Sequence, residues 1–419
     1  MKTYCKPADT DIENADQNMP AVKKCFGGKL KRKDFQRVLI RTGKITKQEI
    51  AQARLDHDKT KVNEAIREVC ERLTQRIRDR NLRLPPIRQF KRRDGLTNKM
   101  RDICQESPDQ QIMEYMAVEA LMPMFKAKLL RHQYGSIPTR GQVGGKRQIE
   151  RLLRRKYPGK VDAVKCDAEK AYPSITVECS MRLLRRDIGK NKTLQWFLGA
   201  LMENYPGGHL CIGGYLPAWL FNYVMSYVLR YLLSLENTRR GAKTKMIQAV
   251  VCFADDFTMF GHFSQIRKAI RKASKWSRST LGLKIKNAWQ IYHLTTFEAE
   301  KEQKKRRVEG SRKRTCGVDM MGFVTYRTYT IIRGRIFRRI RRQILRAAED
   351  LEKLGYIPWW RACKLSAYKG WLKHSDSEKF AKKYHVNEIF RKAAQSVSLH
   401  GRKEHIRNER ALLIEACRG

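Results

Sequence analysis

Apolar side chains recur at helical spacing in the first part of the chain, before the paired prolines Pro85 and Pro86. Thr46 and Glu49 fit a capping box, which predicts a helix that begins near Lys47. These features predict a basic, helical N-terminal extension over residues 1–85. One stripe matches a single helix face: Val62, Ile66, Val69, Cys70, Leu73 and Ile77.

After Pro86 the pattern changes to short apolar runs between helical segments. A helix is expected over roughly 110–130, a strand over VDAVKC up to Asp167, and a buried helix over 216–233. AVVCFADDFTMFG predicts a β-hairpin, because two apolar runs flank one acidic turn. A second β-rich segment surrounds VDMMGFVTYRTYTII, and the chain is again basic and helical from Arg333 onward. The expected fold class is therefore α/β in the broad sense, that is α+β.

The composition of the chain indicates what kind of partner it binds. The chain has 419 residues, of which 42% are hydrophobic, so two to four modules with buried cores are expected. Lys and Arg number 89 against 42 Asp and Glu, which gives a net charge of +47. Such a charge requires a polyanion as partner, although a ribosomal or histone-like protein has the same need. Charge alone therefore indicates nucleic acid without indicating catalysis.

Cysteine usage and hydropathy indicate the compartment. Eleven cysteines are scattered without a C-x-x-C pair, which argues against a disulfide framework and a structural zinc site. The beginning of the sequence turns acidic at once and lacks the apolar core of a signal peptide. The apolar stretch 216–233 is interrupted by Pro217, Asn222 and Arg230, so a buried helix is favoured over a membrane span. We expect a cytoplasmic protein with no membrane partner.

Three carboxylates carry the candidate chemistry. Asp255 and Asp256 lie within an apolar run, where two like charges repel unless a cation neutralises them. An exposed Asp-rich turn is the alternative. Asp167 also ends a predicted strand, 255 − 167 = 88 residues earlier, so adjacent strands can bring it beside Asp255. Carboxylates that converge at strand ends suit two Mg²⁺ ions about 3.5–4 Å apart, with Mn²⁺ as an alternative.

Several segments occur in the order found in reverse transcriptases. KCDAEKAYPSI resembles their first catalytic motif, and FADD resembles their Tyr/Phe-x-Asp-Asp hairpin. CIGGYLPAWLFNYVMSYV resembles the Gly-rich turn and helix under the templating base, and LGLKIKNAWQ followed by VDMMGF resembles the next two motifs. YGSIPTRG and YKGWLKHSD resemble fingers and thumb segments of bacterial retroelement enzymes. The resemblance covers roughly residues 85–380 and identifies the chain as similar to the bacterial retroelement-type reverse transcriptases.

The resemblance implies a right-hand polymerase with a ferredoxin-like antiparallel palm sheet. Fingers are then expected over residues 86–160, the palm over 161–325, and a helical thumb and tail over 326–419. The implied activity is RNA-directed DNA synthesis from dNTPs in a diversity-generating retroelement, a retron, or a bacterial or phage defence system. An RNA template, a DNA product and a specific structured or non-coding RNA are the implied partners.

The resemblance also implies a role for each matching residue at the metals. Asp167 and Asp255 would hold both metal ions, and Asp256 would complete the acidic site. Ala168 would contribute its backbone carbonyl. Tyr172 would be the aromatic gate that excludes a ribose 2′-hydroxyl, with ordinary core packing as the alternative.

Other matching residues would bind the nucleotide. Arg140 and Lys146 would contact the incoming triphosphate; template-phosphate contacts or a solvated face are the alternatives. Gly213, Gly214 and Asn222 match the family's turn and helix. Lys284 or Lys286 would donate a proton to pyrophosphate, and the sequence does not choose between them. Pro217-Ala218 departs from the Ser-Gln of many relatives, and the lysine common near the end of the fourth motif is replaced in NAWQ.

Basic and aromatic residues follow toward the C-terminal end. A single predicted helix contains enough arginine to lie along a duplex backbone. Lys304 to Arg307 are expected in a loop that grips RNA. Trp359, Trp360 and Trp371 can stack on bases, although core packing is the more common use of tryptophan. The arginines of the predicted helix are Arg333, Arg335, Arg338, Arg339, Arg341, Arg342 and Arg346.

Other functions share parts of this pattern. An RNA-binding scaffold or splicing cofactor with a vestigial site explains the charge but leaves three clustered acids unexplained. A template-independent defence polymerase and an RNA-dependent RNA polymerase share the metal geometry. Substrate and template requirements separate these alternatives.

Overall fold

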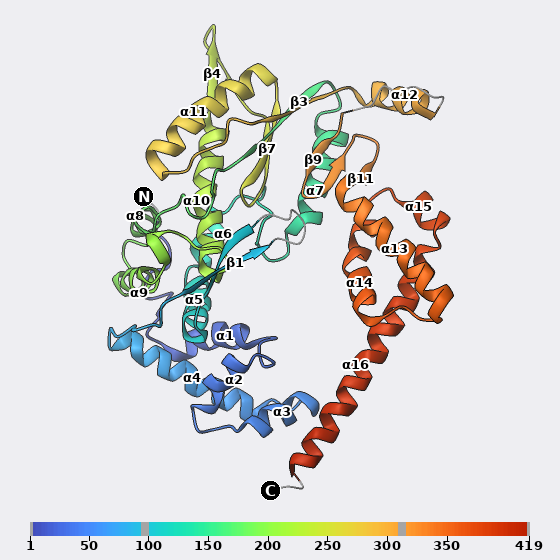
Figure 1. Cartoon of the computed structure of the whole chain (residues 1–419). Coiled ribbons are helices and arrows are strands. Elements are labelled where there is room, and N and C mark those ends of the chain that lie inside the picture. The colour runs from blue at the N-terminus through green and yellow to red at the C-terminus, as the bar shows by residue number, and fades with distance from the viewer. Residues whose placement is uncertain (1–2, 94–99, 309–315, 417–419) are drawn as a thin grey trace. The chain divides into compact units, whose positions relative to one another are not determined.

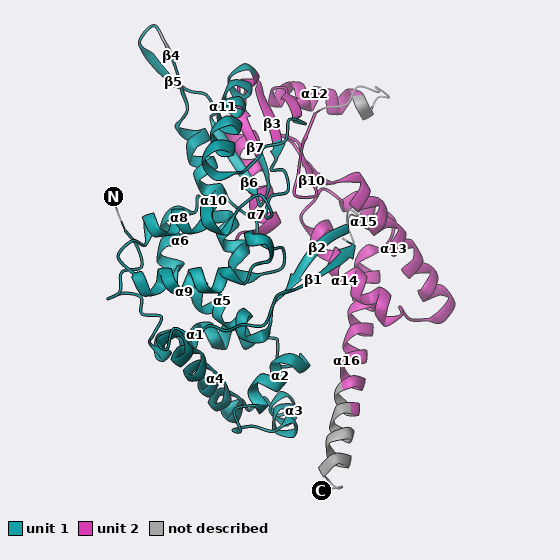
Figure 2. Ribbon diagram, turned by 60° about the vertical axis from the view of Figure 1, so that its left-hand side comes forward, with its two compact units in different colours: residues 1–139, 166–257, 264–289 teal, residues 140–165, 258–263, 290–419 magenta. Residues whose placement is uncertain are grey.

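The computed structural model describes residues 3–93, 100–308 and 316–416, in which helices combine with small antiparallel sheets (Figure 1). This confirms the α+β class. The chain forms two compact units, each assembled from separate stretches (Figure 2). Unit 1 contains residues 1–139, 166–257 and 264–289, and unit 2 contains 140–165, 258–263 and 290–419. The four consecutive modules expected from the sequence stay a prediction.

The N-terminal region of unit 1 is helical, as predicted. The capping box at Thr46 and Glu49 is present and begins a helix at Lys47. The predicted apolar stripe is buried on one longer helix, which packs against the first helix of the chain. The amide of Asn18 donates to the Thr74 hydroxyl at 3.1 Å and ties these two helices together. The four helices are α1 (Ala15–Phe26), α2 (Lys33–Ile40), α3 (Lys47–Leu55) and α4 (Thr60–Arg78).

The rest of unit 1 contains two two-stranded hairpins and a set of helices. The single helix predicted over 110–130 is two helices, α5 (Pro108–Ala120) and α6 (Met122–Lys128), because Pro123 cannot donate a helical hydrogen bond. The predicted buried helix is α10 (Tyr215–Ser234). The remaining elements are β1 (Arg88–Arg93), β2 (Met100–Gln105), α8 (Val177–Asp187), α9 (Lys192–Glu203), β4 (Glu236–Arg239), β5 (Ala242–Lys245) and α11 (Phe263–Leu281).

A four-stranded sheet has the order β6-β7-β3-β8. The strand predicted to end at Asp167 is β3 (Val161–Asp167), and the predicted hairpin is β6 (Ala249–Phe253) with β7 (Asp256–Gly261). Both predictions are confirmed. Strand β8 (Gln290–Leu294) pairs antiparallel with β3. Three of the five residues of β6 and most of β7 are fully buried, which explains why these strands are mainly apolar.

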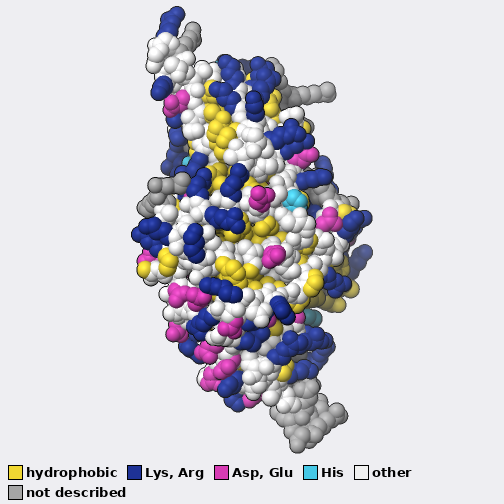
Figure 3. Space-filling model, turned by 90° about the vertical axis from the view of Figure 1, so that its left-hand side faces the viewer, with side chains coloured by type: hydrophobic (Ala, Val, Ile, Leu, Met, Phe, Trp, Pro, Cys, Tyr) yellow, Lys and Arg dark blue, Asp and Glu magenta, His cyan; other side chains and the backbone are white. Residues whose placement is uncertain are grey.

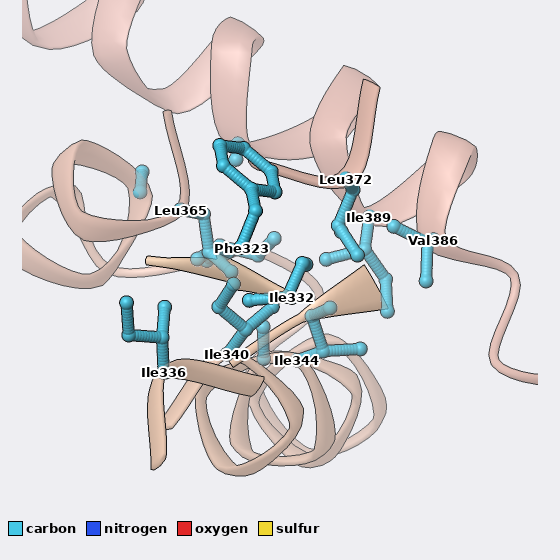
Figure 4. Packing of buried hydrophobic residues seen from close by; sticks show 13 residues of the cluster. Phe323, Ile332, Ile336, Ile340, Ile344, Leu365, Leu372, Val386 and Ile389 are labelled. Atoms are coloured by element: carbon cyan, nitrogen blue, oxygen red, sulfur yellow. The ribbon is translucent and has the colours of Figure 1, made fainter. Parts of the chain in front are cut away.

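Unit 2 is organised around one apolar cluster (Figure 4). Phe323 comes from a small sheet, and Ile340, Leu365 and Ile389 come from three helices that cover it. The predicted C-terminal β segment and helices are thereby confirmed. Besides β8 and a helix over 297–308, the elements of this unit include α7 (Gly141–Arg151), a π-helical turn (Leu152–Lys156), β9 (Val318–Met320), β10 (Phe323–Thr325), β11 (Thr330–Ile332), α13 (Gly334–Leu354), α14 (Trp359–Lys373), α15 (Glu378–Lys383) and α16 (Val386–Ala416).

Arg327 is the largest fully buried side chain in unit 2. Its guanidinium donates to the backbone carbonyls of Leu153, Tyr157, Gly159 and Thr295. Its own backbone N–H donates to the Glu300 carboxylate at 2.9 Å. Arg327 therefore satisfies carbonyls on two distant stretches of chain, at 153–159 and at 295.

One local prediction was wrong. Residues 304–307 were expected in a loop, but they lie in helix α12 (Phe297–Val308). The segment consists mainly of Glu, Lys, Gln and Arg, which are good helix formers, and Glu302 pairs with Arg306 one turn later at 3.1 Å.

Two broader expectations concern thiols and membranes. The cysteines from Cys5 to Cys363 are free thiols, as expected. Throughout residues 3–93, 100–308 and 316–416, no helix has both the length and the apolar character needed to cross a membrane.

Candidate active site

The structure brings Asp167 and Asp255 together in unit 1. Asp167 is the last residue of β3, and Asp255 lies in the turn between β6 and β7. The N–H of Ala168 donates to the backbone carbonyl of Asp255 at 3.1 Å, and the two carboxyl groups are within hydrogen-bonding reach. Burial raises the pKa of Asp255 to about 6, and the negative charges of Asp167 and Asp256 add to the shift. Two acids separated by 88 residues thus form one electrostatic site.

The acidic turn is braced by the segment YGSIPTRG. Tyr134 donates its N–H to the Cys252 carbonyl at 2.9 Å, and Cys252 donates to His132 at 2.8 Å. Ala254 has a φ of +54°, so the turn is held in a left-handed conformation. A Cβ on Gly135 would lie only 2.3 Å from the Ala254 nitrogen, so only glycine allows this approach. The sequence motif of this segment does not by itself indicate this supporting role.

The two candidate lysines have different partners. Backbone bonds from Lys286 to Asp167 (2.9 Å) and from Glu169 to Lys284 (2.8 Å) fix this segment beside the end of β3. The Lys286 ammonium forms an ion pair with the Asp167 carboxylate. The Lys284 ammonium instead pairs with Glu169 at 2.8 Å. Geometry therefore places Lys286, and not Lys284, at the acid pair.

The donor set suits a hard divalent cation. Carboxylate oxygens of Asp167, Asp255 and Asp256 and the Ala168 carbonyl are the oxygen ligands that Mg²⁺ and Mn²⁺ prefer. Within the described part of the chain, no three His, Cys, Asp or Glu side chains already form a metal-binding group. The cation that contacts Asp167 in this arrangement is the Lys286 ammonium. Metal binding by these residues stays a prediction.

Tyr172 lies in the loop after β3, partly exposed. Its ring stacks on Phe221 of α10, with centroids 4.8 Å apart and planes 18° apart. Burial raises the pKa of the Tyr172 phenol to about 12, and the charge of Asp255 contributes. The phenol is therefore neutral at pH 7, and it lies close enough to Asp255 to interact electrostatically with that carboxylate. This position is compatible with a gate, and packing on Phe221 fixes the ring.

Gly213 and Gly214 form a turn in close contact with the chain before α5. Gly213 has a φ of +119°, and a Cβ there would lie 2.6 Å from the Cys104 carbonyl oxygen. A Cβ on Gly214 would lie 2.3 Å from Oε1 of Glu106. Both glycines are thus required by close packing, whatever their contact with nucleotide.

A buried pair of glutamates fixes the beginning of α10. Glu114 accepts hydrogen bonds from the N–H groups of Tyr215 (2.8 Å) and Leu216 (2.9 Å) and from the Tyr205 hydroxyl (2.8 Å). Burial and the nearby Glu114 charge raise the pKa of Glu106 to about 9. We assign the shared proton to Glu106, because Glu114 has three donors that stabilise its charge. Nothing in the sequence spacing of these two glutamates indicates that they share a proton.

The proton on Glu106 makes stability depend on pH. The folded pKa of about 9 lies above the ordinary 4.5, so the native state holds a proton that the unfolded chain releases between these values. The contribution of this proton to stability is complete below pH 4.5 and is lost as pH rises to about 9, by at most about 1.4 kcal/mol per pH unit. Glu106→Gln is expected to remove most of this loss in urea denaturation between pH 6 and 9. An unchanged pH slope would contradict the assignment.

The other predicted nucleotide contacts have structural partners. Asn222 is buried in unit 1, and its amide donates to the Gly135 carbonyl at 3.0 Å, which supports the braced turn from behind. Arg140 and Lys146 belong to unit 2. The Lys146 ammonium is buried and binds Glu150 (3.0 Å) and the His374 carbonyl (3.1 Å). Direct nucleotide contacts by these residues stay predictions.

Basic side chains occur in both units. On α13 the apolar positions face the cluster of Figure 4, and the exposed arginines include Arg335, Arg338 and Arg342. Arg333 pairs with Asp319 at 2.6 Å, and Arg339 is half-buried. Figure 3 shows Lys and Arg side chains spread over the face that contains α8, α9 and α11, with Asp and Glu more frequent toward the N-terminal helices. Such surfaces suit a polyanion.

The three candidate stacking tryptophans differ. Trp359 and Trp360 are 46% and 48% exposed. Trp371 packs against Phe323, with ring centroids 4.9 Å apart. The structure therefore assigns Trp371 to the core and leaves only the first two at the surface.

Comparison with known proteins adds no relative. No protein-family model matches the chain, and no curated protein matches it.

Proposed function

We propose that the chain is an RNA-directed DNA polymerase that transfers nucleotides from dNTPs onto a 3′-hydroxyl. The observation that carries the proposal is the adjacency of Asp167 and Asp255, with Asp256 beside them, at the end of β3 and the β6–β7 turn. In this proposal the β6-β7-β3-β8 sheet is the palm of a right-hand polymerase. Hairpin β1–β2 and helices α5 to α7 belong to the fingers, and α13 to α16 form the thumb.

The residues at the site divide the work of nucleotidyl transfer. Asp167, Asp255 and Asp256 provide oxygen ligands on adjacent backbone segments, and Ala168 adds a carbonyl. Divalent ions bound there would activate the 3′-hydroxyl and stabilise the leaving pyrophosphate. The hydrogen bonds from Ala168 to Asp255 and from Tyr134 to Cys252 hold the carboxylates in place before substrate arrives.

Tyr172 sets the choice between deoxyribose and ribose in this proposal. Its ring stacks on Phe221, and the residue lies close enough to Asp255 for that charge to contribute to the raised pKa of the Tyr172 phenol. Tyr172→Ala is expected to lower the preference for dNTPs over rNTPs by about tenfold or more, since a lost steric contact is worth at least 1.4 kcal/mol. Tyr172→Phe keeps the ring and should keep the preference. Single-nucleotide incorporation with each substrate measures both, and equal preferences in Tyr172→Ala and the parent would contradict the role.

Primer extension tests the proposal as a whole. Purified protein with Mg²⁺ and dNTPs is expected to extend a DNA primer on an RNA template, and sequencing the product verifies copying. DNA made without any template would instead support the template-independent alternative. Extension with rNTPs alone would indicate an RNA polymerase. Absence of extension on all templates would favour the RNA-binding scaffold.

The biological setting we propose is a bacterial or phage retroelement or defence system. The net charge of +47 and the exposed arginines of α13 support a structured RNA as companion. Sequencing the nucleic acid that co-purifies with the protein would identify that RNA. A specific transcript encoded beside the gene is the expected result, and a random sample of cellular RNA would argue against it.

A further inference from the structure

One role considered for Lys286, proton donation to pyrophosphate, does not by itself explain its contact with the acid pair. Its ammonium contacts the Asp167 carboxylate directly, and Asp255 and Asp256 also act on its charge. Lys284, two residues earlier on the same segment, pairs with Glu169 and does not contact the acid pair. The chain therefore directs one of two neighbouring lysines into the acidic site.

The acid pair needs a positive charge even before a metal ion arrives. Asp167 and Asp255 lie within hydrogen-bonding reach of each other, and Asp256 adds a third acid. Like charges this close destabilise the fold unless a cation neutralises them or a proton is bound. The Lys286 ammonium is such a cation, and it is always present because it belongs to the chain itself.

The backbone at Lys286 is fixed by hydrogen bonds, whereas its side chain is partly exposed. The N–H of Lys286 donates to the Asp167 carbonyl at 2.9 Å, and Ile285 pairs with Ala168 in an antiparallel bridge. The side chain of Lys286, in contrast, is 42% exposed. Its ammonium can therefore turn into solvent while the backbone, and with it Asp167, stays in place.

We infer that Lys286 is a resident counter-ion that a divalent ion must displace from Asp167. The inference rests on the proposed function, because it uses the same metal site. Lys286 protects the acid pair when metal is absent, and it competes with the metal when metal is present. The affinity of the free protein for a divalent ion is thus set below the value that the three carboxylates alone would give.

Binding of Mn²⁺ to the full-length protein, followed by the electron paramagnetic resonance signal of the free ion, tests this at constant pH and salt. Lys286→Gln is expected to bind Mn²⁺ about tenfold more tightly, because one positive charge beside the site is removed. Lys286→Met is a second neutral variant that should behave alike. Lys286→Arg retains the charge and should match the parent protein.

Lys284→Gln is the matched control, since it removes the same charge two residues away and should change Mn²⁺ affinity less than twofold. Asp255→Asn should abolish the site. If Asp255→Asn loses Mn²⁺ while the neutral Lys286 variants bind no more tightly than the parent, the counter-ion inference is overturned and the metal site stands. If Asp255→Asn binds Mn²⁺ like the parent, the metal site of the proposed function is itself wrong.

Discussion

Replacing Asp255 by asparagine is expected to reduce RNA-templated DNA synthesis by about 10³-fold or more. Asparagine keeps the size of the side chain and removes the charge that a divalent ion requires. Because Ala168 donates to the backbone carbonyl of residue 255, and not to its side chain, the turn should keep its place in the variant. Initial rates of primer extension at saturating dNTP measure the effect, and circular dichroism verifies the fold.

Glu169→Gln provides the control for that experiment. Glu169 follows Ala168 closely in sequence, but its carboxylate pairs with Lys284 at 2.8 Å and is 37% exposed. Losing this surface pair should change the rate less than about threefold. If Asp255→Asn retains the parent rate, or if both variants lose activity equally, the acid pair is not the catalytic centre.

The largest effect on stability is expected from Arg327→Met. Methionine fills a similar volume but leaves the carbonyls of Leu153, Tyr157, Gly159 and Thr295 without their donor in a buried position. Each unsatisfied buried group costs about 1–3 kcal/mol, so a loss of about 4 kcal/mol or more is expected. The midpoint of thermal unfolding should fall by roughly 5 °C.

Arg338→Met is the matched comparison, since Arg338 is an exposed arginine on α13 of the same unit. A surface substitution of this kind should stay within about 0.5 kcal/mol of the parent. Both variants are compared by urea denaturation followed by circular dichroism. Equal stabilities would show that the four carbonyls find other donors, and the central role assigned to Arg327 would be wrong.

The sequence predicts local elements well where one physical pattern dominates. The stripe on α4, the capping box at Thr46 and the hairpin around Asp255 follow from periodicity, capping chemistry and turn chemistry, and all three are present. The break between α5 and α6 was not predicted, because the apolar residues on both sides of Pro123 continue the same helical spacing. Residues 304–307, predicted as a loop, are helical because Lys and Arg are good helix formers.

The acidic residues of the candidate site could be predicted from the sequence, whereas the contacts that hold them in place could not. A strand end and a hairpin turn suggest that Asp167 and Asp255 meet, and the structure places them together. The partner of Lys286, the close approach of Gly135 and the proton shared by Glu106 depend on packing between distant segments. Neither spacing nor residue type reports such contacts, so side-chain geometry was needed to find them.

The bonds of Arg327 determine how the protein can be divided. Thr295 lies on the same continuous stretch as Arg327, but Leu153, Tyr157 and Gly159 come from a segment more than a hundred residues earlier. A fragment that starts at Gln290 therefore contains one of the four acceptors. The guanidinium of Arg327 would lack the other three carbonyls to which it donates. Cutting the gene at the expected thumb boundary, residue 326, separates the Arg327 side chain from all four acceptors. Any independently produced version of unit 2 has to include residues 140–165, joined by permutation or supplied as a second chain.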